Sequence, residues 1–378
     1  MSTRPPLSPL LKWSGGKRSE IPLLKPSYPK NIKRVVEPFS GGAAVSLEWN
    51  ADYTVLNDVS TGLIDFYSTL KSASLRHDFK TAVDTVDRVR KDISKTVNTL
   101  NQKQIEDVFS NIKTTVILNE KIKNWVVLFP LVIQAQLQKD FAASLQSKIA
   151  VRVPNLEKKH TIVFTFEQRK EHLETALQAG LYTTLRRVYN GEIATTPEWS
   201  TASWYVVRSV CYSGMFRYGK NGAFNVPYGG IAYNSRDFAS ALKHVMSSDV
   251  TDFLSRAEIN QLDFEQLFLK YHNFDSDDFI FVDPPYDSAF SQYNADGDFT
   301  AEDQKRLAQV LLGTQAKWML VIKNTPFILS LYQDPSLFRG VFGKNYQVNF
   351  RNRHDRGVEH LVVTNYPLGS NPHIHMLP

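Results

Sequence analysis

The stretch Arg-Val-Val-Glu-Pro-Phe-Ser-Gly-Gly-Ala-Ala-Val, residues 34–45, decides the fold of this chain. Residues 34–37 predict a short buried strand, and the proline and glycines that follow predict a tight turn before a helix over residues 43–50. A second strand is expected at residues 53–57 and a helix at 60–71. Strand, glycine turn, helix, strand and helix in this order are typical of a parallel sheet with right-handed crossovers.

The same alternation returns in the last third of the chain. The strands expected there are 257–262, 278–282, 318–322 and 360–364, and the helices are 264–271 and 301–312, the latter with Thr300 as its N-cap. Between the two α/β segments, apolar residues at helical spacing predict helices over 76–95, 102–113 and 167–187. The pattern therefore predicts one α/β domain, written in two pieces and interrupted by a largely helical insertion.

The composition excludes several classes of protein. With 42% hydrophobic and 22% charged residues, the 378-residue chain lies near globular averages, which excludes a disordered or collagen-like chain. Its single cysteine, Cys211, can form neither an internal disulfide nor a zinc–thiolate cluster, which favours a reducing compartment. We find no secretory signal and no membrane-spanning run, so we expect a cytoplasmic protein without a membrane partner. The excess of 44 Lys and Arg over 38 Asp and Glu hints at a polyanionic partner.

Asp283-Pro284-Pro285-Tyr286 directly follows the strand expected at residues 278–282. The two prolines fix φ and remove two N–H donors, so the chain leaves the sheet as a rigid extended segment. A carboxylate and bare carbonyls are thereby held at the carboxyl edge of the sheet, where open α/β sheets bind ligands. These acceptors suit an amino group, and the tyrosine offers a flat face to a planar base. The alternative is a proline-terminated strand whose tyrosine packs into the core.

Two further motifs lie near the first strand. The turn that begins at Glu37 lets the backbone approach a ligand, although many α/β turns need glycine for geometry alone. Asp58 comes 21 residues later, at the end of the next strand, where an acidic residue suits ribose hydroxyls. Together they suggest an adenosine-type ligand. The loop Lys12-Trp13-Ser14-Gly15-Gly16-Lys17 is basic and aromatic, and by itself it predicts only a surface turn.

Four motifs in this chain resemble, in their order, those of the Dam-type DNA N6-adenine methyltransferases (D12 class, alpha group). Residues 12–17 resemble their K-W-x-G-G-K motif, and residues 37–45 resemble their E-P-F-x-G-x-G turn. Residues 283–286 resemble their D-P-P-Y tetrapeptide, and residues 222–229, Gly-Ala-Phe-Asn-Val-Pro-Tyr-Gly, are similar to their G-x-F-N-V-P-F/Y-G stretch. The resemblance implies a Rossmann-like S-adenosylmethionine-dependent methyltransferase sheet with an inserted helical and target-recognition region.

The resemblance covers residues 7–70 and 205–365, and residues 72–190 show no match to it. One departure is Ala43, which stands where the family usually has a further glycine. An added methyl group there could crowd the cofactor or simply shift the start of the helix.

The resemblance also assigns residues to roles. The cofactor-binding residues that it implies for S-adenosylmethionine are Trp13, Lys17, Glu37, Phe39, Gly41, Asp58, Asp263 and Phe264. The catalytic residues that it implies are Asp283, Pro284, Pro285 and Tyr286. The residues that it implies for binding double-stranded DNA are Lys12, Arg217, Tyr218, Lys220, Asn221, Asn225 and Pro227.

The activity implied is transfer of a methyl group from S-adenosylmethionine to N6 of a flipped adenine in double-stranded DNA. Asp283 and the Pro284 carbonyl would accept the two N6–H bonds, and Tyr286 would stack on the base. The alternatives are methylation of adenine in RNA and a DNA-binding member of the family with weakened catalysis. The motifs imply neither the recognition sequence nor a restriction, phage or housekeeping context.

The expected division of the chain is a catalytic domain at 1–71 and 236–378, a helical insertion of unknown role at 72–200, and a target-recognition hairpin at 201–235. Further phosphate contacts are hypothesised for Arg186, Arg187, Arg208 and residues 351–354. His373 and His375 are expected in a loose tail without acidic or cysteine neighbours, so no metal site is predicted. We expect a monomer, with a dimer as the alternative.

Overall fold

The computed structural model describes residues 4–13, 15–110, 116–219, 221–285, 299–345 and 357–377, without the side chains of residues 117, 344, 345, 357 and 358. Tyr286, Lys220 and the basic cluster at 351–354 therefore lie outside the described residues. The chain forms two compact units, one from residues 1–71 and 247–378 and the other from residues 72–246. We call them the sheet unit and the helical unit.

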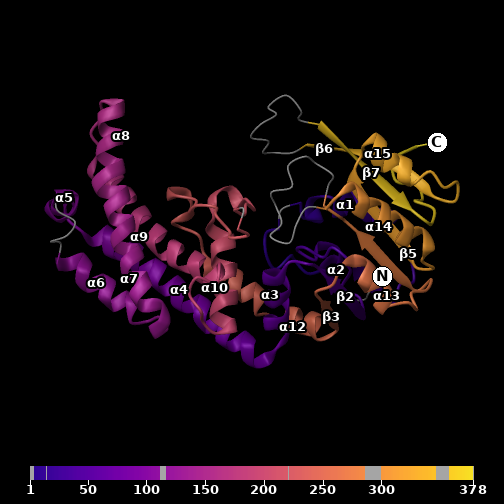
Figure 1. Ribbon diagram of the computed structural model, residues 1–378, viewed down its shortest axis with the longest axis horizontal. Helices are drawn as coiled ribbons and strands as arrows, with labels where there is room; N and C mark the ends of the chain where they lie inside the picture. The colour runs from indigo at the N-terminus through magenta and orange to yellow at the C-terminus, as the bar shows by residue number, and fades with distance from the viewer. Residues whose placement is uncertain are drawn as a thin grey trace. The chain divides into compact units, whose positions relative to one another are not determined.

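The described part of the sheet unit contains one sheet of eight strands in the order β3-β2-β1-β4-β5-β7-β6-β8 (Figure 1). The strands are β1 Arg34–Glu37, β2 Tyr53–Asn57, β3 Ala257–Asn260, β4 Asp278–Val282, β5 Lys317–Lys323, β6 Phe338–Asn345, β7 Gly357–Thr364 and β8 His375–Met376. β3, β2, β1, β4 and β5 are parallel, whereas β7 is antiparallel to β5 and β6, and β8 is antiparallel to β6. This mostly parallel sheet confirms the predicted α/β class and its Rossmann-like character.

The strand order reverses between β1 and β4. From β1 the chain runs outward through β2 to β3 on one side, and it later returns to β4 and then β5 on the other side. Open α/β sheets bind ligands at the carboxyl ends of the strands on either side of such a reversal. Glu37 ends β1 and Asp283 directly follows β4, so this topology places both carboxyl groups at that edge.

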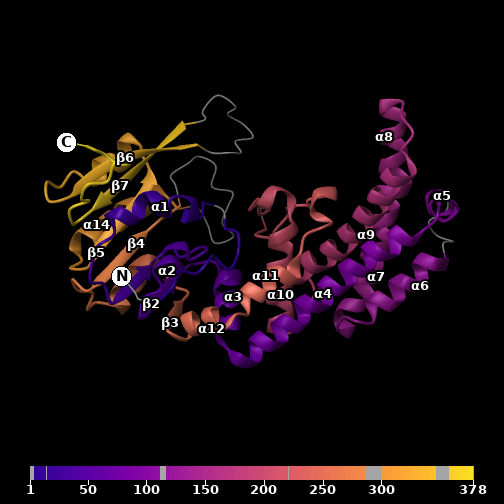
Figure 2. The same ribbon diagram turned by 180° about the vertical axis from the view of Figure 1, so that it is seen from behind.

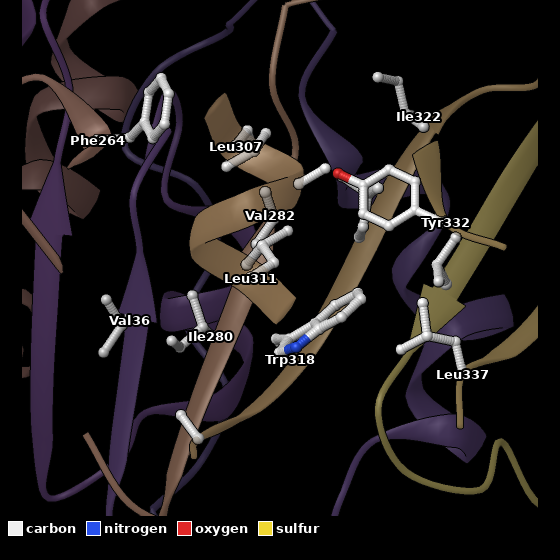
Figure 3. Close-up of a cluster of buried hydrophobic side chains, with 14 of the residues drawn as sticks. Val36, Phe264, Ile280, Val282, Leu307, Leu311, Trp318, Ile322, Tyr332 and Leu337 are labelled. Carbon is white, nitrogen blue, oxygen red and sulfur yellow. The ribbon is translucent and has the colours of Figure 1, made fainter. Parts of the chain in front are cut away.

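Side chains alternate between the two faces of the sheet along its central strands. Val36 and Ile280 join one buried cluster, which Figure 3 shows with Leu307 of a covering helix, whereas Val35 and Phe279 join the cluster on the other face. The helices on the first face are α13 (Phe264–Lys270), α14 (Ala301–Gly313) and α15 (Pro326–Leu331). Those on the second face are α1 (Ile21–Leu24) and α2 (Ala44–Trp49). Two further helices of this unit pack on each other and on β3: α3 (Thr61–Lys71) and α12 (Ser248–Ser255).

Local sequence chemistry explains several element ends. Thr300 caps α14 as predicted, since its hydroxyl accepts the Asp303 N–H while the Asp303 carboxylate accepts the Thr300 N–H. The expectation of a loose C-terminal tail is wrong at His375, which pairs with Val341 of β6 in strand β8. This pairing requires Gly340, because a Cβ atom there would run into the side chain of Ile374.

The helical unit contains α4 (Ala73–Thr99), α5 (Gln102–Ser110), α6 (Val116–Val126), α7 (Leu131–Leu145), a π-helical stretch (Gln146–Arg152), α8 (Val153–His160), α9 (Phe166–Tyr189), α10 (Pro197–Val210) and α11 (Phe238–Val245) (Figure 2). α9 packs on α4, α7 and α10. Gly180 permits the contact with α7, because a Cβ atom there would lie 2.9 Å from Phe141 Cα. α11 packs on α4, so the chain returns to the sheet unit at 247 and not at the expected 236.

Residues 211–219 and 221–233, between α10 and α11, fold back on themselves, and within these two stretches no regular strand forms. Single antiparallel bridges join Cys211 to Tyr228 and Tyr218 to Phe224. The segment is therefore an irregular antiparallel loop that begins at the buried end of α10. Among the described residues of both units, no helix has the length and apolar character needed to cross a bilayer.

Candidate active site

Asp283, the first residue after β4, forms an ion pair with Lys17. The Lys17 Nζ atom lies 2.5 Å from Asp283 Oδ1 and also donates to the Gly15 carbonyl at 3.3 Å. The exposed fraction of the side chain is 2% for Lys17 and 20% for Asp283, so this pair is largely withdrawn from water. The structure thereby joins the N-terminal basic loop to the D-P-P segment, which lies 266 residues further along the chain.

The glycine turn after β1 is packed against Trp13. Gly41 has a φ of +45°, and a Cβ atom on it would lie 2.7 Å from Trp13 Cδ1 and 2.8 Å from Trp13 Nε1. Its N–H donates to Asp58 Oδ2 at 3.0 Å, and its carbonyl accepts from the Tyr67 hydroxyl at 2.8 Å. Glycine is therefore required here both by the left-handed conformation and by the close approach of the indole ring.

The Asp58 carboxylate accepts backbone hydrogen bonds from two segments, the glycine turn and the residues just before helix α3. Its Oδ1 atom accepts the Ser60 N–H at 3.0 Å, while its Oδ2 atom accepts the Gly41 N–H. Asp58, predicted from the sequence to bind a ribose, directly follows β2 and is half-buried beside the glycine turn. Tyr67, which sequence reasoning missed, completes this arrangement from helix α3.

Glu37 is a buried carboxyl group at the end of β1, with a residue exposure of 3%. Its Oε1 atom accepts the Ser46 N–H at 2.7 Å from inside helix α2. Burial raises the pKa of Glu37 to about 8, against the effect of the Ser46 hydrogen bonds, and the negative charge of Asp283 adds to the increase. The site therefore holds a carboxyl group that titrates near neutral pH.

Three phenylalanine rings meet beside the glycine turn. Phe39 lies 5.7 Å from Phe264 and 5.5 Å from Phe299, measured between ring centroids. Asp263, just before Phe264, caps α13 by accepting the Glu265 N–H at 3.0 Å. These side chains provide an apolar surface with a carboxylate at its edge, an arrangement suited to a planar base bearing hydrogen-bond donors.

Arg306 of α14, which the sequence analysis did not identify, organises this surface. Its guanidinium group binds Asp263 at 2.8 Å and Glu265 at 2.7 Å, and its carbon atom lies 4.8 Å from the centre of the Phe264 ring. It also binds Asp303 at 2.7 Å on its own helix. The i, i+3 spacing of Asp303 and Arg306 was visible in the sequence, but the contacts of Arg306 to the start of α13 were not.

Ala43 has a left-handed backbone conformation, with φ 50° and ψ 37°, and it is fully buried. Helix α2 begins one residue later, at Ala44, rather than at the predicted Ala43. Ala43 therefore has the left-handed conformation that glycine adopts easily, at the position where the similar family motif usually has glycine. For alanine this conformation is strained.

The predicted DNA-binding residues lie in both units. Lys12 is exposed in the loop of the sheet unit, and Lys220 lies outside the described residues. In the helical unit, Asn221, Asn225 and Pro227 are exposed, while Arg217 and Tyr218 are half-buried. Arg217 donates to the Asn225 side chain at 2.7 Å, which rigidifies the irregular loop and presents both groups together.

The same loop is anchored by residues that the sequence analysis missed or assigned to DNA. Asn190 accepts the Phe224 N–H at 2.8 Å and donates to its carbonyl at 3.1 Å. Arg208 stacks on the ring of Phe216, and burial lowers its pKa to about 10. Arg187 binds Asp140 and Glu192 within the unit. Arg208 thus supports the fold of the loop, and Arg187 ties α9 to Asp140 of α7, roles for which their charge alone gave no signal.

Comparisons with known proteins show the family of this chain. A family model described as D12 class N6 adenine-specific DNA methyltransferase matches residues 13–346. The chain is 33% identical over 169 residues to the Type II methyltransferase M.CviBI of Paramecium bursaria Chlorella virus NC1A, which covers 43% of this chain and 59% of that protein. It is 24% identical over 378 residues to M.MjaIII of Methanocaldococcus jannaschii, covering 95% of this chain and 99% of that one. It is also 22% identical to M1.LlaDCHI of Lactococcus lactis, covering 95% and 96%.

Proposed function

Because the chain belongs to the D12 class of N6 adenine-specific DNA methyltransferases, we propose that it transfers a methyl group from S-adenosylmethionine to N6 of an adenine in double-stranded DNA. The observation that supports this most directly is the meeting of the D-P-P segment and the glycine turn at the reversal of strand order between β1 and β4. An acceptor for an amino group and a site for an adenosine-type ligand are therefore side by side.

The residues at this edge fit S-adenosylmethionine. Gly41 lets the indole ring of Trp13 pack directly on the backbone of the glycine turn, which brings an aromatic ring to this edge. Glu37 offers a buried carboxyl group to a positively charged ligand, and the half-buried Phe39, which packs on the buried Phe264, offers an apolar face to its base. When bound, this cofactor would supply a methyl group attached to a sulfonium, whose sulfur leaves as a neutral thioether without further activation when the C–S bond breaks.

The protein's contribution to the reaction is positioning and hydrogen bonding. Asp283 and the Pro284 carbonyl are the acceptors assigned to the two N6–H bonds of the adenine. When these two acceptors receive hydrogen bonds from both N6–H groups, the nitrogen lone pair is drawn out of conjugation with the ring. The lone pair can then act as the nucleophile. Lys17 holds the Asp283 carboxylate in place through Oδ1. Tyr286 is assigned to stacking on the target base, which must leave the duplex to reach these groups.

The charge distribution supports a nucleic-acid partner for the helical unit. Residues 72–246 contain 24 Lys and Arg against 15 Asp and Glu, whereas the sheet unit contains 20 against 23. The positive charge of the chain thus lies in the unit that carries the predicted recognition loop, including Arg217 and Asn225. A phosphate backbone attracts such a surface, and its binding should weaken as salt concentration rises.

Methyl transfer with tritiated cofactor tests this proposal, using duplex DNA, duplex RNA and single strands of each. We expect label in N6-methyladenine of duplex DNA only. Asp283→Ala should abolish transfer while DNA binding is kept, and Asp334→Ala, in an exposed surface turn, serves as the matched control. Label in RNA alone would show that the substrate is RNA and not DNA. No transfer to any adenine-containing DNA would refute the proposal. Mapping N6-methyladenine in a host that expresses the chain would identify the recognition site.

A further inference from the structure

Gln304 is a buried polar residue on the apolar face of helix α14. Its exposure is 0%, and the residues three, four and seven positions later, Leu307, Ala308 and Leu311, are all buried as well. Figure 3 shows Leu307 and Leu311 within the core cluster on this side of the sheet. A glutamine in this stripe breaks the pattern expected for a helix that packs on a sheet, which points to a role other than packing.

The side chain of Gln304 reaches the D-P-P segment. Its Nε2 atom donates a hydrogen bond to the Pro285 carbonyl at 3.0 Å. Its Oε1 atom is buried and accepts no hydrogen bond from any residue that the structure describes. Burying an amide with one group unsatisfied costs stability, and a leucine of similar size would avoid that cost. The residue is therefore better explained by the contact with Pro285 than by the stability of the core.

The contact with Pro285 can orient the Pro284 carbonyl, which is assigned to the adenine. Pro284 and Pro285 have no N–H groups, so the backbone of this segment cannot anchor itself by donating hydrogen bonds. The ring of Pro285 fixes its φ, and holding its carbonyl fixes its ψ. Because peptide units are planar, these two angles fix the orientation of the Pro284 carbonyl relative to the Pro285 carbonyl, which Gln304 holds.

Helix α14 is itself well fixed at this point. The capping box of Thr300 and Asp303 closes its first turn, and Arg306 ties it to Asp263 and Glu265. Gln304 lies between these two anchors, one residue after Asp303 and two before Arg306. Its amide is thus presented to the D-P-P segment from a rigid support.

We propose that Gln304 is a positioning residue for the methyl transfer, which holds the Pro285 carbonyl and so directs the Pro284 carbonyl toward the adenine amine. This inference rests on the proposed function. Gln304 contacts neither the adenine nor the cofactor in this assignment, so it acts on the rate of the chemical step and not on binding.

The first test compares Gln304→Leu with Gln178→Leu. Gln178 is also 0% exposed, donates to a backbone carbonyl (Arg90, 3.0 Å), and has a buried Oε1 atom without a partner among the described residues. We expect both leucine variants to unfold at a urea concentration equal to or above that of the unsubstituted chain. Only Gln304→Leu should lose kcat, by roughly 10- to 100-fold, with the Kd for the cofactor and for duplex DNA changed less than about twofold.

The second test uses Gln304→Glu, which keeps the shape of the side chain. A protonated carboxyl group can donate to the Pro285 carbonyl, whereas an ionised one cannot, so kcat relative to the unsubstituted chain should fall as pH rises. Gln304→Leu should show a ratio that does not change with pH. A merely structural role for Gln304 would not produce this difference between the two variants.

The outcomes separate this inference from the proposed function. No methyl transfer by the unsubstituted chain refutes the proposed function itself. An active unsubstituted chain with an equally active Gln304→Leu variant overturns the positioning role alone. A Gln304→Leu variant that loses cofactor binding and stability together with kcat would also overturn it, because such a joint loss would show a structural role.

Discussion

Replacing Glu37 by Gln tests the buried carboxyl group at the end of β1. The substitution keeps an oxygen atom for the Ser46 N–H, which now donates to Glu37 Oε1 at 2.7 Å, but it removes the titration. The pKa of Glu37 is about 8 in the folded protein because of its burial, against an ordinary value of 4.5. The protonated form is therefore the one that the folded cofactor-free protein favours at neutral pH.

The sign of the effect on stability follows from this difference. Between pH 4.5 and pH 8 the folded chain holds a proton on Glu37 that the unfolded chain has lost, so the free energy of unfolding falls as pH rises. The contribution is fully present below pH 4.5 and is lost by about pH 8. A difference of about 3.5 pKa units corresponds to a total loss on the order of 5 kcal/mol across this range.

Urea unfolding of the cofactor-free protein at a series of pH values measures this contribution. The Glu37→Gln variant should show a flatter dependence on pH than the unsubstituted chain, by on the order of 1 kcal/mol per pH unit between pH 5 and pH 8. Glu48→Gln is the control, since Glu48 pairs with Lys25 at 2.6 Å near the surface. Equal slopes for the Glu37→Gln variant and the unsubstituted chain would refute the assignment of a protonated buried carboxyl.

The same carboxyl group should respond to the cofactor. A positive charge placed near Glu37 favours its ionised form, so cofactor binding below pH 8 should release a proton. Titration calorimetry in two buffers of different ionisation enthalpy counts that proton. The release should be absent in Glu37→Gln, and a cofactor that binds the unsubstituted chain without proton release would contradict the placement of its charge beside Glu37.

The remaining predictions concern the residues that assemble this edge of the sheet. Lys17→Met removes the cation that pairs with the largely buried Asp283 carboxylate, so we expect a loss of about 3 kcal/mol in unfolding free energy together with a fall in kcat. Lys33→Met, at an exposed pair, should cost little by comparison. An unchanged stability of Lys17→Met would show that the pair contributes nothing. Gly41→Ala should cost at least about 2 kcal/mol and weaken cofactor binding, because its Cβ atom meets Trp13. Ala43→Gly should change stability by less than about 1 kcal/mol, since relief of the left-handed strain offsets the loss of a buried methyl group; denaturant unfolding of both variants checks this contrast, and equal losses would contradict it.

The central strands were predictable because their sequence pattern is local. The strands at 34–37, 53–57 and 278–282 have the predicted bounds, since each is a short run of strand-forming residues that ends at a turn or a proline. Strand β6 was missed because Gly340 and Gly343 interrupt its pattern. Gly340 is required by the approach of β8, and this tertiary reason leaves no local signal.

The candidate site was predictable as a set of motifs but not as a set of contacts. The motif order placed Lys17, Gly41 and Asp283 in one family pattern, and topology explains why they share one edge of the sheet. The ion pair between Lys17 and Asp283 joins residues 266 positions apart, and no periodicity reports such a pairing. Gln304 and Arg306 were missed for the same reason, because on sequence alone they belong to an ordinary capped helix.

The position of the helical unit in the chain explains how the sheet tolerates it. The unit begins after α3, which ends at Lys71, and the chain returns to the sheet unit just before α12, which begins at Ser248. These two helices pack on each other, and the Lys71 Nζ atom donates to the Ala257 carbonyl at 2.6 Å, at the start of β3. Because the chain leaves and re-enters the sheet unit at neighbouring points, an insertion of almost any size closes there at little entropic cost to the sheet. The predicted recognition loop can therefore vary while β1, β4 and the groups at their ends keep their places, which would separate the choice of DNA sequence from the proposed chemistry on adenine.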